Sequence, residues 1–328
     1  MRLIASTAVV LLLASISAWG ALPKADNVDA TINRGLGFLA KDAMAWKQEH
    51  KCVSCHHAGL MIWSMREAKN RGHVVDDAAL ADLTQWVADV EYGSYVEPRP
   101  VGVPKRLSAG NAWFALGFEA DPKPDAASQK ELKLLLNVVE SDQTETGGYT
   151  SWPQTRPPFF GESDDTMTAL ATLSVLSAAA RGDADAKVVR DKGVKWLAET
   201  KTDDDPQSIA LRLLVWKRLG RPAKEWMPLV QRIKDRQNED GGWSQAKDMA
   251  SDAWATGQAL YALADAGVKS REPAISRGQA FLIKTQREDG SWPMTSRPRD
   301  HNGARAMNLV PITGAGSAWA VLGLVRSR

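Results

Sequence analysis

Apolar residues recur along the chain at helical spacing, which predicts a protein built from amphipathic helices. Two kinds of helix alternate, and both tend to open on Asp, Asn or Ser and to end near Gly. The first kind carries the Lys, Glu and Asp residues and is expected near residues 28–42, 77–92, 128–141, 186–200, 224–237 and 272–285. The second kind is rich in Ala, Leu and Trp and is expected near residues 58–71, 109–120, 164–180, 206–219, 252–266 and 315–326.

The second kind of helix should form the buried layer, because it has few charged positions. Six buried helices inside six charged ones predict an all-α fold, the closed α6/α6 toroid. We expect one domain over residues 21–328. The connections from outer to inner helices are the long ones, at 43–57, 93–108, 142–163, 238–251 and 286–314. Long loops on one face of a rigid scaffold favour a site at that mouth of the toroid.

An internal repeat supports this fold. Its most complete copy contains Arg277-Gly278, Phe281-Leu282, Gln286, Gly290 and Trp292. A second copy has Gln237, Gly241-Gly242 and Trp243, and a looser one has Gln143, Gly147-Gly148-Tyr149 and Trp152. The unit resembles the QW repeat of the squalene/hopene cyclase and prenyltransferase-like superfamily. That resemblance implies an α/α toroid in which Gln and Trp tie helix ends together. It does not give a function, since cyclases, transferases, lyases and binding proteins share the architecture.

The first residues predict export. An uncharged run from Leu3 to Ile16 precedes the small residues Ala18 and Gly20, as in a secretory signal peptide over residues 1–20. An uncleaved anchor is the alternative. We expect a periplasmic or secreted protein with no further membrane span, because no other apolar run approaches the roughly 20 residues that a span needs. The 41 basic and 39 acidic residues give a net charge of +2 without a basic stripe, which argues against nucleic acid as a partner.

The first long connection contains Cys52-Val53-Ser54-Cys55-His56. This Cys-x-x-Cys-His spacing is typical of covalent haem c, with Cys52 and Cys55 on the vinyl groups and His56 as the proximal iron ligand. The partner would then be a redox protein or a small ligand at the mouth. A Cys52–Cys55 disulfide and a zinc site are the alternatives.

Ring closure should bring the last long connection beside the haem segment. The candidates for the sixth iron ligand there are His301, Met294 and Met307, with Met61, Met65, His50 and His73 weaker. Haem propionates could meet Arg156, Arg297, Arg299 and Arg305.

A second candidate site is Glu162-Ser163-Asp164-Asp165-Thr166. It resembles the Asp-x-Asp-Asp-Thr acid motif of class II cyclases, with Glu162 in place of the first Asp. The resemblance implies that Asp164 is the acid and Asp165 its partner. The alternative is that Asp164 caps an inner helix, as Asp252, Asn111 and Ser317 would do elsewhere in the ring. Full-length triterpene cyclases also use two helical domains, whereas this chain is expected to have one.

Trp113, Trp254 and Trp319 recur at one position of the buried helices. They either line a cavity or pack the core. From the sequence we expect an exported c-type haem protein that acts in electron transfer or binds a small ligand. The first alternative is a class II terpene cyclase-like enzyme that uses Asp164 and Asp165. The second is a haem-free toroid that binds a partner or a glycan.

Overall fold

A computed structural model describes residues 25–50, 53–89, 109–151, 163–297 and 308–328. The outer helices are α1 (Ala25–His50), α3 (Asp77–Ala88), α5 (Ala126–Asp142), α7 (Ala184–Glu199), α9 (Ala223–Lys234) and α11 (Pro273–Thr285). The inner helices are α2 (Leu60–Asn70), α4 (Ala109–Glu119), α6 (Asp164–Arg181), α8 (Pro206–Arg218), α10 (Ala253–Asp265) and α12 (Val310–Ser327). A π-helical turn, η1 (Cys55–Gly59), leads into α2, and a two-stranded antiparallel ribbon, β1 (Trp243–Ser244) and β2 (Ser251–Asp252), precedes α10.

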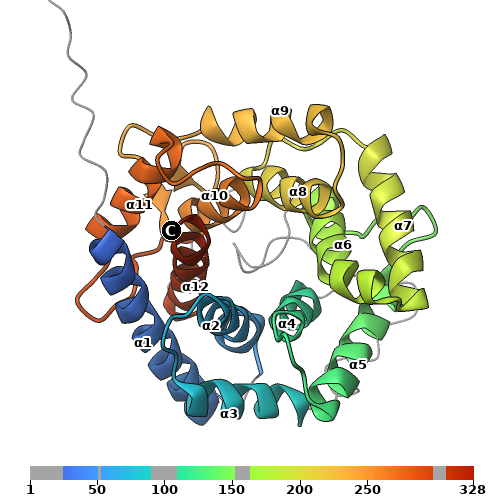
Figure 1. Cartoon of the computed structure of the whole chain (residues 1–328), viewed down its shortest axis with the longest axis horizontal. Helices are drawn as coiled ribbons and strands as arrows, with labels where there is room; N and C mark the ends of the chain where they lie inside the picture. The colour runs from blue at the N-terminus through green and yellow to red at the C-terminus, as the bar shows by residue number, and fades with distance from the viewer. Residues whose placement is uncertain (1–24, 51–52, 90–108, 152–162, 298–307) are drawn as a thin grey trace, which may run out of the picture.

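The inner helices form a closed ring. Each contacts the next in chain order, and α12 contacts α2, which completes the circle (Figure 1). The outer helices surround this ring. The predicted α6/α6 toroid is therefore confirmed. The inner layer is buried as expected, because its helices are apolar on nearly every side; in α6, for example, residues 165–176 are all buried.

The glutamine of each repeat ties two outer helices together. Its Nε2 donates one hydrogen bond to the glycine carbonyl in its own turn and a second to a carbonyl of the next outer helix. The pairs of acceptors are Gly147 and Val189 for Gln143, Gly241 and Ala274 for Gln237, and Gly290 and Thr31 for Gln286, all at 2.8–3.1 Å.

The aromatic residue of each repeat anchors the following loop. Trp243 Nε1 donates to Ile233 O at 2.7 Å, and Trp292 Nε1 donates to Leu282 O at 2.8 Å. In the third copy Tyr149 takes this place, with its hydroxyl 2.9 Å from Val139 O. Trp152, which the sequence placed in that copy, lies outside the described residues.

Some boundaries differ from the prediction. The loop expected at 43–57 is largely helical, because α1 continues to His50 and η1 begins at Cys55. Asn111 and Ser317, expected as caps, lie inside α4 and α12 instead. Helix α12 begins earlier than predicted, with Pro311 in its first turn, where a missing N–H costs nothing. No helix in the described part of the chain is long and apolar enough to cross a membrane.

Candidate functional site

The amino ends of the inner helices meet at the face that carries the long connections. Three of these ends have capping side chains that accept a hydrogen bond from the N3 backbone: Ser163 for α6, Asp205 for α8 and Asp252 for α10. The α6 and α8 ends are also joined to each other, since Thr166 Oγ1 lies 2.5 Å from Ser208 Oγ and 3.2 Å from Asp205 Oδ2. Desolvation raises the pKa of Asp205 to about 6.

Asp165 is buried at this face and forms an ion pair with an arginine. Its side chain is 2% exposed, and Arg212 of α8 holds its Oδ1 through Nε, at 3.1 Å, and through Nη2. The other carboxylate oxygen accepts the backbone N–H of Asp203 at 2.9 Å. Burial raises the pKa of Asp165, and Arg212 opposes that rise. Arg212 also donates to Leu197 O, so the pair fastens α6, α7 and α8 together.

Asp164 has a different environment. It is the first residue of α6 and is exposed at the mouth, and its Oδ1 accepts the backbone N–H of Ser151 at 2.6 Å. The helix cap is Ser163, so the predicted capping role of Asp164 belongs to the preceding residue. The two adjacent aspartates of the motif are therefore unequal, with one reachable from solvent and one committed to an ion pair.

Asp252 is connected to Arg297 through the side-chain amide of Gln245. Gln245 Nε2 donates to Asp252 Oδ2 at 2.5 Å, and Gln245 Oε1 accepts from Arg297 Nε at 2.9 Å. All three residues are at most 4% exposed. Desolvation raises the pKa of Asp252 to about 7, and desolvation lowers the pKa of Arg297 to about 10. Arg297, a predicted contact for haem propionates, thus serves the α10 end; Arg156, Arg299 and Arg305 lie outside the described residues.

Four tryptophans from four inner helices meet at the axis of the ring. We call Trp63, Trp113, Trp254 and Trp319 the aromatic plug; each is at most 2% exposed. Helices α4 and α10 stand opposite each other in the ring, yet the Trp113 and Trp254 ring centroids are 6.4 Å apart. Trp319 lies within 6.0 Å of the other three. The recurring tryptophans therefore pack against each other across the axis and close it at this level.

A charged network lies on the far side of the plug, at the carboxyl ends of the inner helices. The Tyr261 ring packs on Trp63 and Trp319, and its hydroxyl donates to Glu67 at 2.8 Å and accepts from Arg218 at 2.9 Å. Asp265 pairs with Arg218 and with Arg326. These contacts link α2, α8, α10 and α12, so the axis is polar below the plug.

Gln207, near the start of α8, is a buried amide. It is 1% exposed, and neither its Oε1 nor its Nε2 has a hydrogen-bond partner in the part of the chain that the structure describes. Its spacing of seven and eleven residues from Leu214 and Arg218 puts it on the same face of α8. Arg218 contacts Tyr261 from that face, so we place Gln207 on the axis side, near the mouth.

The Cys-x-x-Cys-His segment packs into the wall of the ring. His56 and His57 are 4% and 0% exposed, with His56 Nδ1 in contact with His57 Nδ1 and 3.2 Å from Ser54 Oγ. His57 Nε2 lies 2.9 Å from Asp42 Oδ2, and the His57 ring stacks on Trp46. Cys52 and the side chain of Cys55 lie outside the described residues. Covalent haem c on these cysteines therefore stays a sequence prediction.

The expected sixth ligands are only partly described. Met294 is buried at 4% exposure, against Gly316 of α12, while His301 and Met307 lie outside the described residues. Met61 and Met65 belong to the core, and His50 stacks on Trp46. Among the described residues, no group of three or more His, Cys, Asp or Glu side chains is placed to hold a metal ion.

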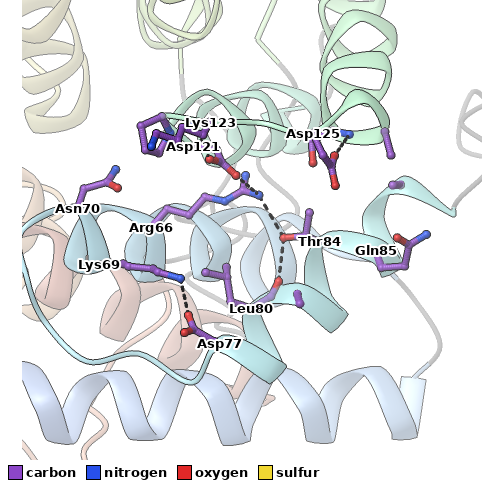
Figure 2. Close-up of a pocket in the computed structure, with 15 residues that line it drawn as sticks. Arg66, Lys69, Asn70, Asp77, Leu80, Thr84, Gln85, Asp121, Lys123 and Asp125 are labelled. Carbon is purple, nitrogen blue, oxygen red and sulfur yellow. Dashed lines mark hydrogen bonds and ion pairs between the residues drawn. The ribbon is translucent and has the colours of Figure 1, made fainter.

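A separate groove of about 580 Å³ lies on the outer side, between α2, α3 and the start of α5 (Figure 2). Two ion pairs lie in it: Lys69 pairs with Asp77 at 2.6 Å, and Arg66 with Asp121 at 3.2 Å. Asp125 caps α5 through Ser128 N. Because it lies at the end with the short connections, this groove is not part of the mouth.

Comparisons with known proteins agree with this fold. The family model of the squalene-hopene cyclase C-terminal domain matches residues 221–328. No curated protein sequence matches the chain. An Arg-to-Ala variant of the type II terpene cyclase MstE from Scytonema, solved with geranylgeranyl dihydroxybenzoate, superposes with a TM-score of 0.57 at 14% identity, covering 92% of this chain and 97% of that one.

Two other solved structures share the fold. The polysaccharide lyase BACCELL_00875 has a TM-score of 0.55 at 10% identity, covering 91% of this chain and 96% of its own. A glycosyl hydrolase of family 88 from Bacteroides vulgatus has a TM-score of 0.54 at 12% identity, with coverages of 93% and 99%. The resemblance to the α/α-toroid superfamily of QW-repeat proteins is confirmed.

The comparisons correct the functional expectation. The expected haem electron-transfer protein is wrong: the family model is that of a cyclase domain, and the structural neighbours are terpene cyclases, a lyase and a hydrolase. The comparisons overturn the electron-transfer role that was drawn from the Cys-x-x-Cys-His spacing, and they do not test haem attachment at that segment. The type II terpene cyclase MstE is covered over 97% of its length by this chain, so the two structures are of similar extent.

Sequence reasoning missed three site residues. Arg212 lies 47 positions from Asp165, and Gln245 lies 52 positions from Arg297 although only seven from Asp252. Gln207 has no hydrogen-bond partner among the described residues, and none of the three belongs to a motif. The faint signal was a charged or amide residue within an otherwise apolar inner helix, as with Gln207 and Arg212 in α8. Such a residue needs a buried partner or a ligand.

Proposed function

We propose that the protein is a class II terpene cyclase-like enzyme that protonates an isoprenoid at the mouth of the toroid. The carrying observation is the unequal pair at the start of α6, in which Arg212 holds Asp165 while Asp164 is exposed beside it. The cyclase-like family match and the full-length similarity to a type II terpene cyclase support the assignment. The partner is then a small isoprenoid, and the predicted signal peptide supports action outside the cytoplasm.

Asp164 is the proton donor in this proposal because, of the two adjacent aspartates at the start of α6, it is the exposed one. Asp165 is held by Arg212, and Asp205 and Asp252 are occupied in capping α8 and α10. A general acid must come within hydrogen-bond distance of the atom that it protonates. An apolar chain lying over Asp164 would exclude water from the carboxyl group.

The chemistry balances without a redox step. The carboxyl proton of Asp164 adds to an alkene carbon or an epoxide oxygen, and the carbocation that forms is attacked by the next double bond of the same chain. Loss of one proton to water then gives a cyclic isomer of the substrate. Asp164 regains a proton from solvent. Asp165 and Arg212 are positioning residues, since they fix the first turn of α6.

The test is cyclisation of geranyl, farnesyl and geranylgeranyl dihydroxybenzoates by the purified full-length protein, followed by mass spectrometry and NMR. We expect an isomeric ring product from at least one substrate, carrying one deuterium when the reaction runs in D2O. Asp164→Asn should lower the rate by about 10²–10⁴-fold.

The matched control is Asp204→Asn, because Asp204 is an exposed aspartate just before the neighbouring inner helix. It should leave the rate unchanged. A folded wild-type protein that cyclises none of the three substrates would refute the proposed function. An active Asp164→Asn variant would refute the assignment of the acid.

A further inference from the structure

We propose that the outer groove between α2, α3 and the start of α5 is a second binding site, which takes a neutral polyhydroxylated ligand of the size of a short oligosaccharide (Figure 2). The groove is separate from the mouth, so this inference does not rest on the proposed function. Its volume of about 580 Å³ lies within the roughly 300–1,000 Å³ that are typical of small-molecule sites.

The groove has a fixed floor. Arg66 of α2 extends between the two walls, and its side chain is 8% exposed. Its Nη1 donates to Gly117 O at 2.9 Å, and its guanidinium carbon lies 5.3 Å from the centre of the Phe118 ring. Asn70 Nδ2 donates to Ala120 O at 2.8 Å, which holds the end of α2 against the end of α4. The floor is therefore in place before a ligand binds, which lowers the entropic cost of binding.

The charges in the groove are equal in number and largely paired. Three basic and three acidic side chains line it: Arg66, Lys69, Lys123, Asp77, Asp121 and Asp125. Two of the cations pair with two of the carboxylates, as described above. Lys123 and Asp125 have no ion-pair partner within the described residues, but they lie on the same wall with opposite charges. A charged ligand would have to displace a paired group, so the groove favours a neutral one.

The paired groups keep hydrogen-bonding capacity. A carboxylate can accept about four hydrogen bonds, and an ammonium group donates three. Among the described residues, Asp77 Oδ2, Asn70 Oδ1 and Gln85 Oε1 accept no hydrogen bond, and Lys69 Nζ donates only to Asp77. A hydroxyl group both donates and accepts, so it can bind such groups without breaking an ion pair.

The rest of the lining is apolar. Leu80, Ala81 and Ala88 belong to the α3 wall, and Pro122 and Ala127 to the opposite wall. A sugar ring carries hydroxyl groups around its edge and C–H groups on its faces, so it matches both parts of this lining. An isoprenoid chain would leave the polar groups without partners, which is unfavourable.

The experiment is an NMR titration of the full-length protein with three neutral trisaccharides, namely maltotriose, cellotriose and laminaritriose. We expect at least one of them to bind, with an affinity that is the same at low salt and in about 0.5 M NaCl, because no net charge is exchanged. The anionic trisaccharide trigalacturonate should bind no better than the best neutral one.

The variant that locates the site is Ala81→Trp. Ala81 is exposed on α3 and lines the groove, so an indole there occupies ligand space without entering the core. We expect the affinity to fall at least about tenfold, which corresponds to 1.4 kcal/mol. The matched control is Ala280→Trp, since Ala280 is an exposed alanine of another outer helix, α11, outside the groove lining. It should bind as the wild type does.

Three results would overturn the inference. They are a folded wild type that binds none of the neutral trisaccharides, a folded Ala81→Trp variant with wild-type affinity, and tighter binding of trigalacturonate that weakens with salt. Circular dichroism checks that each protein is folded. Binding at the groove in a protein that cyclises no isoprenoid would reject the proposed function alone.

Discussion

Two buried carboxyl groups at the mouth are connected to arginines in different ways. Asp165 at the start of α6 touches the guanidinium of Arg212 directly, whereas Asp252 at the start of α10 reaches Arg297 through the amide of Gln245. Desolvation raises the pKa of both carboxyl groups, but at Asp165 an adjacent cation opposes the rise. One ring therefore holds one buried carboxyl group by a cation in direct contact and another through an amide, and at Asp252 desolvation raises the pKa to about 7.

The largest expected effect comes from breaking the direct pair. Arg212→Met leaves Asp165 buried without its cation, and we expect a loss of about 3–5 kcal/mol in unfolding free energy. Urea denaturation at pH 7 measures it. The double variant Asp165→Asn with Arg212→Met removes both charges and should recover most of the loss. Equal losses in the single and double variants would show that the pair is not coupled.

The next effect is the pH dependence set by Asp252. Its pKa is about 7 in the folded protein and about 3.9 in an unfolded chain, so between these values the folded state holds a proton that the unfolded state has released. The wild type should therefore lose stability as pH rises through this window, by up to roughly 4 kcal/mol. Asp252→Asn keeps a capping side chain and removes this contribution.

The measurement is the unfolding free energy of both proteins at pH 5 and pH 8. The difference between Asp252→Asn and wild type should move in favour of the variant as pH rises. Parallel pH profiles would mean that Asp252 is ionised throughout and that the amide link is as effective as a direct ion pair.

A smaller effect is expected from cutting the link itself. Gln245→Leu removes the donor to Asp252 and the acceptor for Arg297 Nε, so we expect a loss of about 2 kcal/mol. The loss should be larger at pH 8 than at pH 5, because the missing donor stabilises the ionised form of Asp252. A loss independent of pH would place the role of Gln245 in packing alone.

The smallest effect concerns an exposed pair near the first carboxyl group. Arg232 and Asp204 are 3.0 Å apart, with 31% and 85% of their side chains exposed. Arg232→Ala should cost less than about 1 kcal/mol, and the cost should vanish in 1 M salt. Thermal melts at low and high salt test this. A salt-independent loss would show that the Arg232 hydrogen bond to Asp203 O carries the effect instead.

The sequence predicts the ring because each helix pair carries its own complete pattern. Gln286, Gly290 and Trp292 lie close together in the chain, and they make in the structure the contacts that the repeat implies. The pairing of buried carboxyl groups with cations at the mouth could not be predicted in this way. Asp165 and Arg212 are 47 positions apart, and the residue types alone do not pair them. Cys52, Cys55 and His56 show the opposite failure, in which a local spacing favoured a function that the comparisons do not support.

The tie between Gln286 and Thr31 joins the last outer helix to the first, and Arg328 pairs with Asp29 beside it. The order of helices in space is therefore a circle, in which the start of α1 and the end of α12 are neighbours. A circular permutant that links these ends and opens at the Gly220 turn should keep every helix contact. In the natural order, α1 must wait for α11 and α12 to be synthesised before its repeat contacts form. Closure of the ring therefore cannot precede synthesis of the last helix pair, and a permutant would move that closing contact to a different pair of helices.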